Sequence, residues 1–167
     1  TNTFGANWSN LSDYDIDDRI EELAKAGAEI ARESAEKYEK KDGRMRWTLG
    51  SMGPGTKLPS LGHTTYDHLK KTFALQAKGL ILGGADAFMV ETSQDLLQTK
   101  AAINGCRVAM VETDTRLPLF VEVTVETTGT MLMGSEINAA LTALEPLGID
   151  MIGLNCATGP QEMSEHL

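Results

Sequence analysis

The residues best suited to chemistry follow an apolar segment late in the chain. Residues 151–154 are predicted to form a strand, and Asn155 and Cys156 come directly after it. Pro160 then suits the first turn of a helix. Enzymes built from parallel strands and helices place their chemistry where the carboxyl end of a strand meets the next helix. Cys156 is therefore a candidate metal ligand or substrate contact, and the alternative is a small buried hydrophobe.

A carboxylate ends a second apolar segment. Glu91 follows Phe88-Met89-Val90, so its charge loses hydration unless a cation or hydrogen-bond donors pair with it. A substrate ammonium group is one such partner, and a structural Lys or Arg at a neighbouring strand end is the other. Asn2, Gly53 and Glu122 are further candidates, because each belongs to a predicted strand or its carboxyl end.

Strands and amphipathic helices alternate along the chain. Strands are predicted at 1–4, 47–52, 87–91, 119–125 and 151–154. Helices are predicted from Ser12 or Asp13 to near Tyr38, from Thr65 to Gly83, from Asp95 to near Gly105, from Ser135 to Pro146 and from Pro160 onward. This alternation indicates βαβ units and a parallel sheet.

Two α/β architectures fit this order: a doubly wound open sheet and a (β/α)8 TIM barrel. The doubly wound sheet usually carries a glycine-rich phosphate turn, and the sequence has neither G-x-G-x-x-G nor a P-loop. About five strands in 167 residues extrapolate to the roughly 250 residues of a complete barrel. We therefore expect an incomplete (β/α)8 barrel of about five strands that belongs to a longer polypeptide.

Composition excludes several partners. The net charge of −9 and the pI near 4.8 argue against nucleic acid and against an anionic membrane surface. Two cysteines, Cys106 and Cys156, do not make a disulfide framework, so a reducing cytoplasm is expected. Apolar runs long enough to span a bilayer are absent from the sequence.

Several short motifs together resemble a known family. They are Thr1-Asn2-Thr3-Phe4-Gly5-Ala6, Gly53-Pro54, Gly83-Gly84-Ala85-Asp86, Val90-Glu91-Thr92 and Gly153-Leu154-Asn155-Cys156 with Gly159-Pro160. In order and spacing they resemble the homocysteine-binding domain of cobalamin-dependent methionine synthases, in the homocysteine S-methyltransferase superfamily. The resemblance covers essentially the whole chain. It implies that residues 1–167 are part of a (β/α)8 barrel domain whose first and last strands are missing.

The resemblance also implies a set of site residues. The family binds zinc through three cysteines, and Cys156 matches the one in its Gly-x-Asn-Cys motif. The motif Gly-Gly-Cys-Cys-Gly-Thr, which supplies the other two, is absent here, as is the early Asp-Gly-Ala segment that helps to seat the amino acid. Glu91 resembles the carboxylate that holds the homocysteine ammonium group. Asn155 and Asn2 resemble hydrogen-bonding residues that shape the substrate site.

The implied activity is transfer of a methyl group to homocysteine, giving methionine. Zinc would hold the substrate thiol as a thiolate, methylcobalamin would be the proximal donor and methyltetrahydrofolate the ultimate donor. The cobalamin-binding and folate-binding domains would lie elsewhere in the same polypeptide. The alternatives are a betaine- or S-methylmethionine-dependent homocysteine methyltransferase, and a barrel without catalytic activity that serves as a scaffold.

Overall fold

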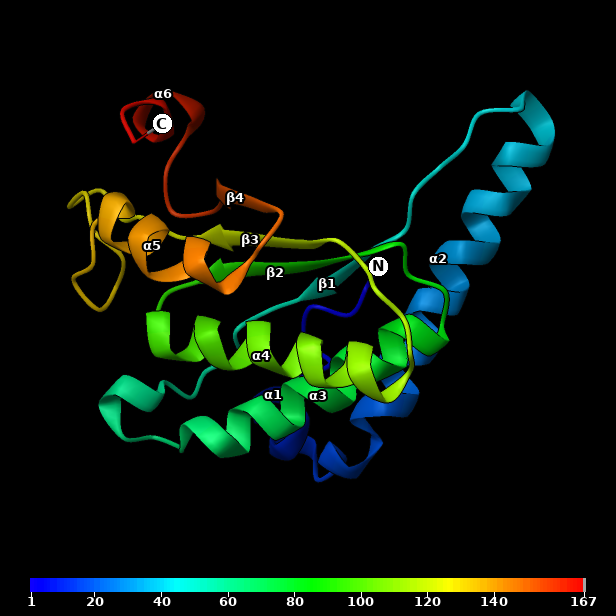
Figure 1. Cartoon of the computed structure of the whole chain (residues 1–167), viewed down its shortest axis with the longest axis horizontal. Helices are drawn as coiled ribbons and strands as arrows, with labels where there is room; N and C mark the ends of the chain where they lie inside the picture. Colours follow the sequence, from blue (N-terminus) through cyan, green and yellow to red (C-terminus); the bar gives the residue numbers. More distant parts are fainter. Residues whose placement is uncertain (167) are drawn as a thin grey trace.

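The structure, a computed structural model, describes residues 1–166. Four parallel strands form one sheet in the order β1-β2-β3-β4, with a helix between successive strands (Figure 1). The strands are β1 (Leu49–Met52), β2 (Ala87–Ser93), β3 (Leu119–Val123) and β4 (Met151–Leu154). The helices are α1 (Trp8–Leu11), α2 (Ile20–Asp42), α3 (Tyr66–Leu82), α4 (Leu96–Glu112), α5 (Ile137–Leu144) and α6 (Pro160–Ser164). The predicted parallel α/β arrangement is confirmed.

The segment Thr1–Phe4 is not the fifth strand that the sequence predicts. It runs beside β1, where the Thr1 ammonium group donates to the Leu49 carbonyl at 2.9 Å. The Thr3 hydroxyl donates to the Ser51 carbonyl at 2.7 Å, and the Ser51 N–H donates to the Thr1 hydroxyl at 2.9 Å. Side-chain hydroxyls thus take bonds that the backbone of a fifth strand would make, so the extended segment does not form a regular ladder.

The first long helix begins later than predicted. Ser12 lies in a short 3-10 turn that ends at Asp15, whose φ of +54° is left-handed. A left-handed residue interrupts a right-handed helix, so α2 starts at Ile20 after a second 3-10 turn.

The starts of the next two helices are as predicted. The Thr65 hydroxyl accepts from the His68 N–H at the start of α3. The Asp95 carboxylate accepts from the Leu97 N–H at 2.8 Å at the start of α4. Asp95 is buried and also accepts two hydrogen bonds from Ser60, so it fixes the loop after β1 to the start of α4. α4 continues past Gly105 to Glu112, beyond its predicted end.

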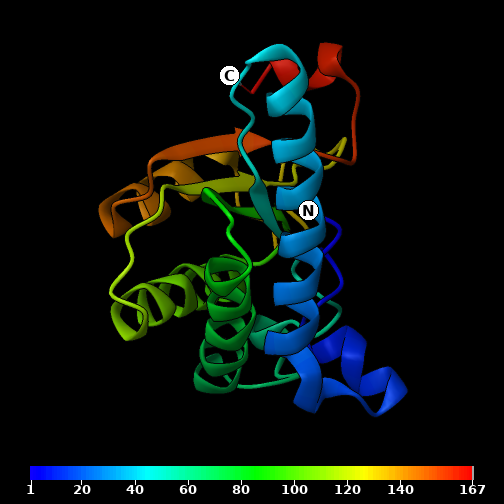
Figure 2. The ribbon, with the colours of Figure 1, turned by 90° about the vertical axis from the view of Figure 1, so that its right-hand side faces the viewer.

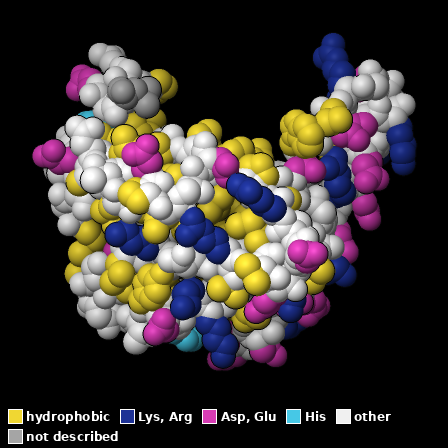
Figure 3. All heavy atoms as spheres, in the orientation of Figure 1, with side chains coloured by type: hydrophobic (Ala, Val, Ile, Leu, Met, Phe, Trp, Pro, Cys, Tyr) yellow, Lys and Arg dark blue, Asp and Glu magenta, His cyan; other side chains and the backbone are white. Residues whose placement is uncertain are grey.

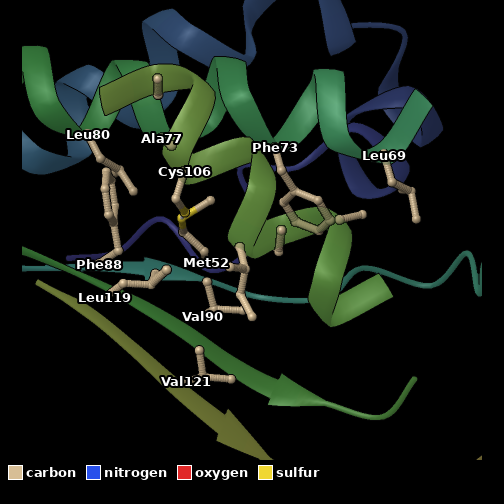
Figure 4. Close-up of a cluster of buried hydrophobic side chains, with 14 of the residues drawn as sticks. Met52, Leu69, Phe73, Ala77, Leu80, Phe88, Val90, Cys106, Leu119 and Val121 are labelled. Carbon is tan, nitrogen blue, oxygen red and sulfur yellow. The ribbon is translucent and has the colours of Figure 1, made fainter. Parts of the chain in front are cut away.

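The hydrophobic core lies between the sheet and helices α3 and α4. Alternate strand residues point into it, among them Met52, Phe88 and Val121, and Phe73 of α3 faces them (Figure 4). Cys106 of α4 is fully buried here, and its Sγ lies 3.6 Å from the Met52 sulfur. Burial raises the pKa of the Cys106 thiol, so this cysteine acts as a core hydrophobe.

Glycines let the helices behind the sheet pack with their backbones in direct contact. A Cβ atom at Gly79 of α3 would collide with the Glu21 carbonyl oxygen of α2, and one at Gly83 would collide with the Lys25 carbonyl oxygen. At Gly105 of α4 it would lie 2.8 Å from Cβ of Phe73. The three helices therefore form one tightly packed layer.

The opposite face of the sheet is not covered by helices α3 and α4, which lie together on one side (Figure 2). Four apolar side chains, those of Leu49, Met89, Phe120 and Met151, point toward this open face and are half-buried or exposed. The surface is hollowed there between the projecting ends of α2 and α6, and hydrophobic side chains reach it (Figure 3). In a closed barrel this face would line the interior. Among the described residues, no helix is both long and apolar enough to cross a membrane.

Candidate functional site

The predicted site residues Glu91 and Asn155 meet at the carboxyl ends of the strands. Glu91, near the end of β2, accepts a hydrogen bond at Oε1 from the Ser51 hydroxyl of β1 at 2.6 Å. Its Oε2 accepts from the Asn155 side-chain amide, which follows β4, at 3.4 Å. The carboxylate therefore has donors from both sides and no Lys or Arg partner among the described ion pairs. The structural ion pair considered for Glu91 is thus not seen within residues 1–166.

A β-bulge shapes this end of β2. Val90 pairs with Val121 and Ser93 pairs with Val123, so two residues of β2, Glu91 and Thr92, oppose one residue of β3. Thr92 has a φ of +59°. A β-branched residue in the left-handed region costs about 1–3 kcal/mol. Bulges of this kind are frequent beside active sites, where they redirect side chains.

The Asn155 side chain supplies hydrogen-bond partners for Thr92, which the bulge leaves without a strand partner. Its Oδ1 accepts from the Thr92 backbone N–H at 3.0 Å and from the Thr124 hydroxyl at 3.3 Å. Its Nδ2 donates to the Thr92 hydroxyl at 2.9 Å as well as to Glu91. All four hydrogen-bonding positions of the carboxamide are thus used inside the protein. Asn155 thus connects the residues of the site, and the Glu91 carboxylate lies on the open face of the sheet.

Cys156 lies next to this network. Its side chain is exposed, and its φ of +59° is left-handed, as is that of Ala157 at +53°. Its Sγ is 3.7 Å from the Thr92 hydroxyl, within the range of a hydrogen bond to sulfur. We call Ser51, Glu91, Thr92, Thr124, Asn155 and Cys156 the strand-end cluster. It joins the ends of β1, β2, β3 and β4.

Glu122 of β3 faces the same side of the sheet as Glu91. It pairs in register with Gly153 of β4, and its side chain passes over that glycine. Burial, and secondly the negative charge of Glu91, raise the pKa of the Glu122 carboxyl. The carboxyl groups of Glu91 and Glu122 therefore both lie on the open face of the sheet, toward the carboxyl ends of the strands.

Asn2 is not part of the strand-end cluster. It is exposed, and its backbone carbonyl lies near Gly27 of α2. Gly53 is buried under the Phe4 ring, where a Cβ atom would lie 2.7 Å from the ring carbons. Of the predicted residues, the structure therefore brings together Glu91, Asn155 and Cys156.

Sequence reasoning missed the three hydroxyl residues of the cluster. Ser51, Thr92 and Thr124 each contact Glu91 or Asn155 directly. They could have been found from their position, because each lies within two residues of a candidate site residue in a predicted strand or at its end.

The described residues offer one exposed cysteine sulfur to a metal and do not by themselves complete a metal site. Within residues 1–166 there is no group of three or more His, Cys, Asp or Glu side chains that could hold an ion. Cys156 nevertheless suits one position of a shared ligand set, because its sulfur is exposed at the strand ends and its close neighbour is a neutral hydroxyl.

A hollow of about 640 Å³ lies at the other end of the sheet. Arg107 and Arg116 line it together with Leu119 at the start of β3 and Asp150 just before β4. It therefore belongs to the amino ends of the strands, whereas barrel enzymes carry their active sites at the carboxyl ends. It is separate from the strand-end cluster.

Comparison with known proteins agrees with the fold and with the predicted family. Residues 1–167 match the family described as homocysteine S-methyltransferase. Over all 167 residues the chain is 63% identical to the methionine synthase of Mycobacterium tuberculosis (strain ATCC 25618 / H37Rv) and 62% identical to that of Mycobacterium leprae (strain TN). It spans 14% of the length of each of these relatives.

Solved structures show the same fold. The metallated form of the homocysteine methyltransferase MmuM from Escherichia coli matches with a TM-score of 0.79 over 98% of this chain and 59% of that one, at 15% identity. The oxidized form matches with a TM-score of 0.58 at 13% identity, over 98% of this chain and 76% of that one. The structural likeness supports the predicted incomplete (β/α)8 barrel. By the match over its whole length, the chain belongs to the homocysteine S-methyltransferase family.

Proposed function

We propose that this chain is the homocysteine-binding part of a cobalamin-dependent methionine synthase. The observation that carries the proposal is the meeting of Glu91 and Cys156 in one cluster at the carboxyl ends of parallel strands, linked through Asn155 and Thr92. Identity of 62–63% to two methionine synthases favours this activity over a betaine- or S-methylmethionine-dependent methyltransferase and over a scaffold without activity.

Cys156 is proposed as one of three sulfur ligands of a zinc ion. The other two would come from a Cys-Cys pair that is not in this sequence. When bound, zinc supplies a Lewis acid that keeps a coordinated thiol deprotonated at neutral pH, which makes the sulfur nucleophilic. Three protein ligands leave a fourth position for the homocysteine sulfur. The exposure of Cys156 supports this role, because a buried thiol could not reach a shared ion.

Glu91 is proposed to bind the ammonium group of homocysteine. The Ser51 hydroxyl and the Asn155 amide donate to its two oxygens and so orient the carboxylate. A half-buried carboxylate to which residues 1–166 supply no cation suits a substrate ammonium group, because a charge-assisted hydrogen bond then replaces lost hydration. Asn155 would shape the site by holding Glu91 and Thr92. Asn2 would contribute only through the segment that lies along β1.

The proposal places residues 1–167 in the middle of the barrel, without its first and last strands. The open sheet face supports this, since apolar side chains such as Phe120 and Met151 would be covered when the barrel closes. Domains that bind methylcobalamin and methyltetrahydrofolate would deliver the methyl group from elsewhere in the same polypeptide. The free thiols Cys106 and Cys156 suit a reducing cytoplasm.

The test uses the full-length protein that carries this chain. Wild type should bind zinc and methylate homocysteine from methylcobalamin, with betaine and S-methylmethionine inactive as donors. Cys156→Ala should lose most of its zinc, because it lacks one of the three sulfur ligands. Cys106→Ala is the matched control and should keep its zinc, since that thiol is buried in the core. Equal zinc content in wild type and Cys156→Ala would refute the assignment of Cys156, and methyl transfer from betaine would favour the alternative enzyme.

A further inference from the structure

We propose that the Thr92 hydroxyl is a positioning group that donates a hydrogen bond to the Cys156 sulfur when that sulfur is a metal ligand. The inference rests on the proposed function, in which Cys156 binds zinc. It concerns a residue outside the ligand set, so Thr92 would act through Cys156 and Asn155 and would not touch the metal.

The hydrogen bonds around Thr92 fix the direction in which its hydroxyl donates. The hydroxyl oxygen accepts from Nδ2 of Asn155 at 2.9 Å, and it lies 3.7 Å from Sγ of Cys156. A hydroxyl has one hydrogen to donate. A thiolate ligand has no hydrogen of its own, so in the metal-bound state the hydroxyl must be the donor of the Thr92–Cys156 hydrogen bond.

Two positions of unusual backbone geometry meet at this contact. Thr92 and Cys156 both have φ values of +59°, although they lie at the ends of different strands. Glycine or asparagine adopts this conformation at lower cost than a β-branched residue. The presence of threonine in the bulge therefore points to a use for its side chain, and the only hydrogen-bond partners that the described residues give its hydroxyl are Asn155 and Cys156.

The hydrogen bond between Thr92 and Cys156 also restricts the conformations of the exposed Cys156 side chain. Within residues 1–166, the hydrogen bond to Thr92 is the only one recorded for Cys156 Sγ. Asn155 holds Thr92 at both its N–H and its hydroxyl, so the donor itself is fixed. The series Glu91–Asn155–Thr92–Cys156 thus links the proposed ammonium-binding carboxylate to the proposed metal ligand.

The experiment compares Thr92→Val with Thr92→Ser in the full-length protein. Valine keeps the shape and the β-branching of threonine, and therefore the backbone strain, but has no hydroxyl. Serine keeps the hydroxyl. Thr142→Val on the exposed side of α5 makes the same chemical change away from the strand-end cluster and serves as the control. Circular dichroism and thermal unfolding verify that each variant is folded.

The probes are zinc affinity, measured by chelator competition, and the sulfur-to-metal charge-transfer absorption of the protein loaded with Co²⁺. Loss of a group that supports a metal ligand typically weakens metal binding by about tenfold or more, so Thr92→Val should bind zinc about tenfold more weakly. Its charge-transfer band should move to lower energy, because a hydrogen bond stabilises the sulfur electrons. Thr92→Ser should restore both values, and Thr142→Val should match wild type.

The outcomes separate this inference from the proposed function. A folded Thr92→Val protein with the zinc affinity and band position of wild type would overturn the role of Thr92 and leave Cys156 as a ligand. If Thr92→Ser showed the same zinc affinity and band position as Thr92→Val, the loss of the hydroxyl would be excluded as the cause of the change, and the role of Thr92 would again be overturned. If wild type itself showed no sulfur-to-cobalt band, the proposed function would fail and the inference with it.

Discussion

The Asn155 carboxamide takes the place of a neighbouring strand for the backbone N–H of Thr92, accepting its hydrogen bond at 3.0 Å. The bulge in β2 would otherwise leave that N–H without a partner in a half-buried position. Asn155 thus stabilises the local backbone and, through its amide group, orients Glu91. The same side chain therefore supports both the bulge and the Glu91 carboxylate.

This dual role predicts a measurable loss of stability in Asn155→Ala. The change removes the acceptor for Thr92 and for the buried Thr124 hydroxyl, and an unsatisfied buried donor costs about 1–3 kcal/mol. Urea unfolding of this domain in the full-length protein should show a loss of that size. Asn138→Ala on the exposed surface of α5 is the control and should be within about 0.5 kcal/mol of wild type. Equal stability of the two variants would contradict the structural role of Asn155.

Glu91→Gln should weaken homocysteine binding far more than it alters zinc content. Glutamine can keep the hydrogen bond from Ser51 but lacks the charge for an ammonium group, and a charge-assisted bond contributes about 1.5–3 kcal/mol. The KM for homocysteine should therefore rise at least about tenfold in steady-state assays. Glu33→Gln on the exposed surface of α2 removes the same charge at a distance from the site and should leave KM unchanged. An unaltered KM in Glu91→Gln would return Glu91 to a structural role.

The raised pKa of Glu122 predicts a stability effect that depends on pH. A carboxyl whose pKa is higher in the folded state favours folding when it is protonated, and this contribution is lost as the pH rises through the folded-state pKa. Glu122→Gln carries a neutral group at every pH, so it should be more stable than wild type at pH 7. The difference should vanish below about pH 4, where Glu122 is protonated in both states. Thermal unfolding of the substrate-free protein between pH 4 and 7 tests this, and a gain that is constant across this range would contradict it.

Residues 1–167 expressed alone should self-associate through the open sheet face. Leu49 and Met151 are 37% and 40% exposed there, and the sheet has an unpaired edge at β4. Phe120→Lys should reduce association in analytical ultracentrifugation, because it places a charge on that face. Val111→Lys, at an exposed position of α4, is the control. A soluble monomer that unfolds cooperatively would show instead that this part of the barrel is stable with its interior open.

The elements that position the site could be predicted because their signals are local. Thr65 and Asp95 cap α3 and α4 as expected. The apolar segments that lead to Glu91 and Asn155 form β2 and β4 of one parallel sheet, with β3 between them. The carboxyl ends of parallel strands share one edge, so the meeting of Glu91 with Asn155 followed from the order of the elements alone.

The details that could not be predicted depend on contacts between distant residues. Nothing in the sequence around Thr92 marks a bulge, because the bulge depends on the register with β3 and on the Asn155 side chain. For the same reason the four internal hydrogen bonds of the Asn155 side chain could not be predicted. The hydroxyls of Thr1 and Thr3 form bonds of a kind that strand periodicity does not reveal.

The glycine contacts between the helices have a consequence for motion in this protein. Where the backbones of α2, α3 and α4 touch at Gly79, Gly83 and Gly105, one helix cannot slide past another without steric collision. The three helices are therefore expected to move together as one rigid layer. Conformational changes near the strand ends would then have to arise in segments outside both the helical layer and the strand-end cluster, such as 126–136 and 157–159.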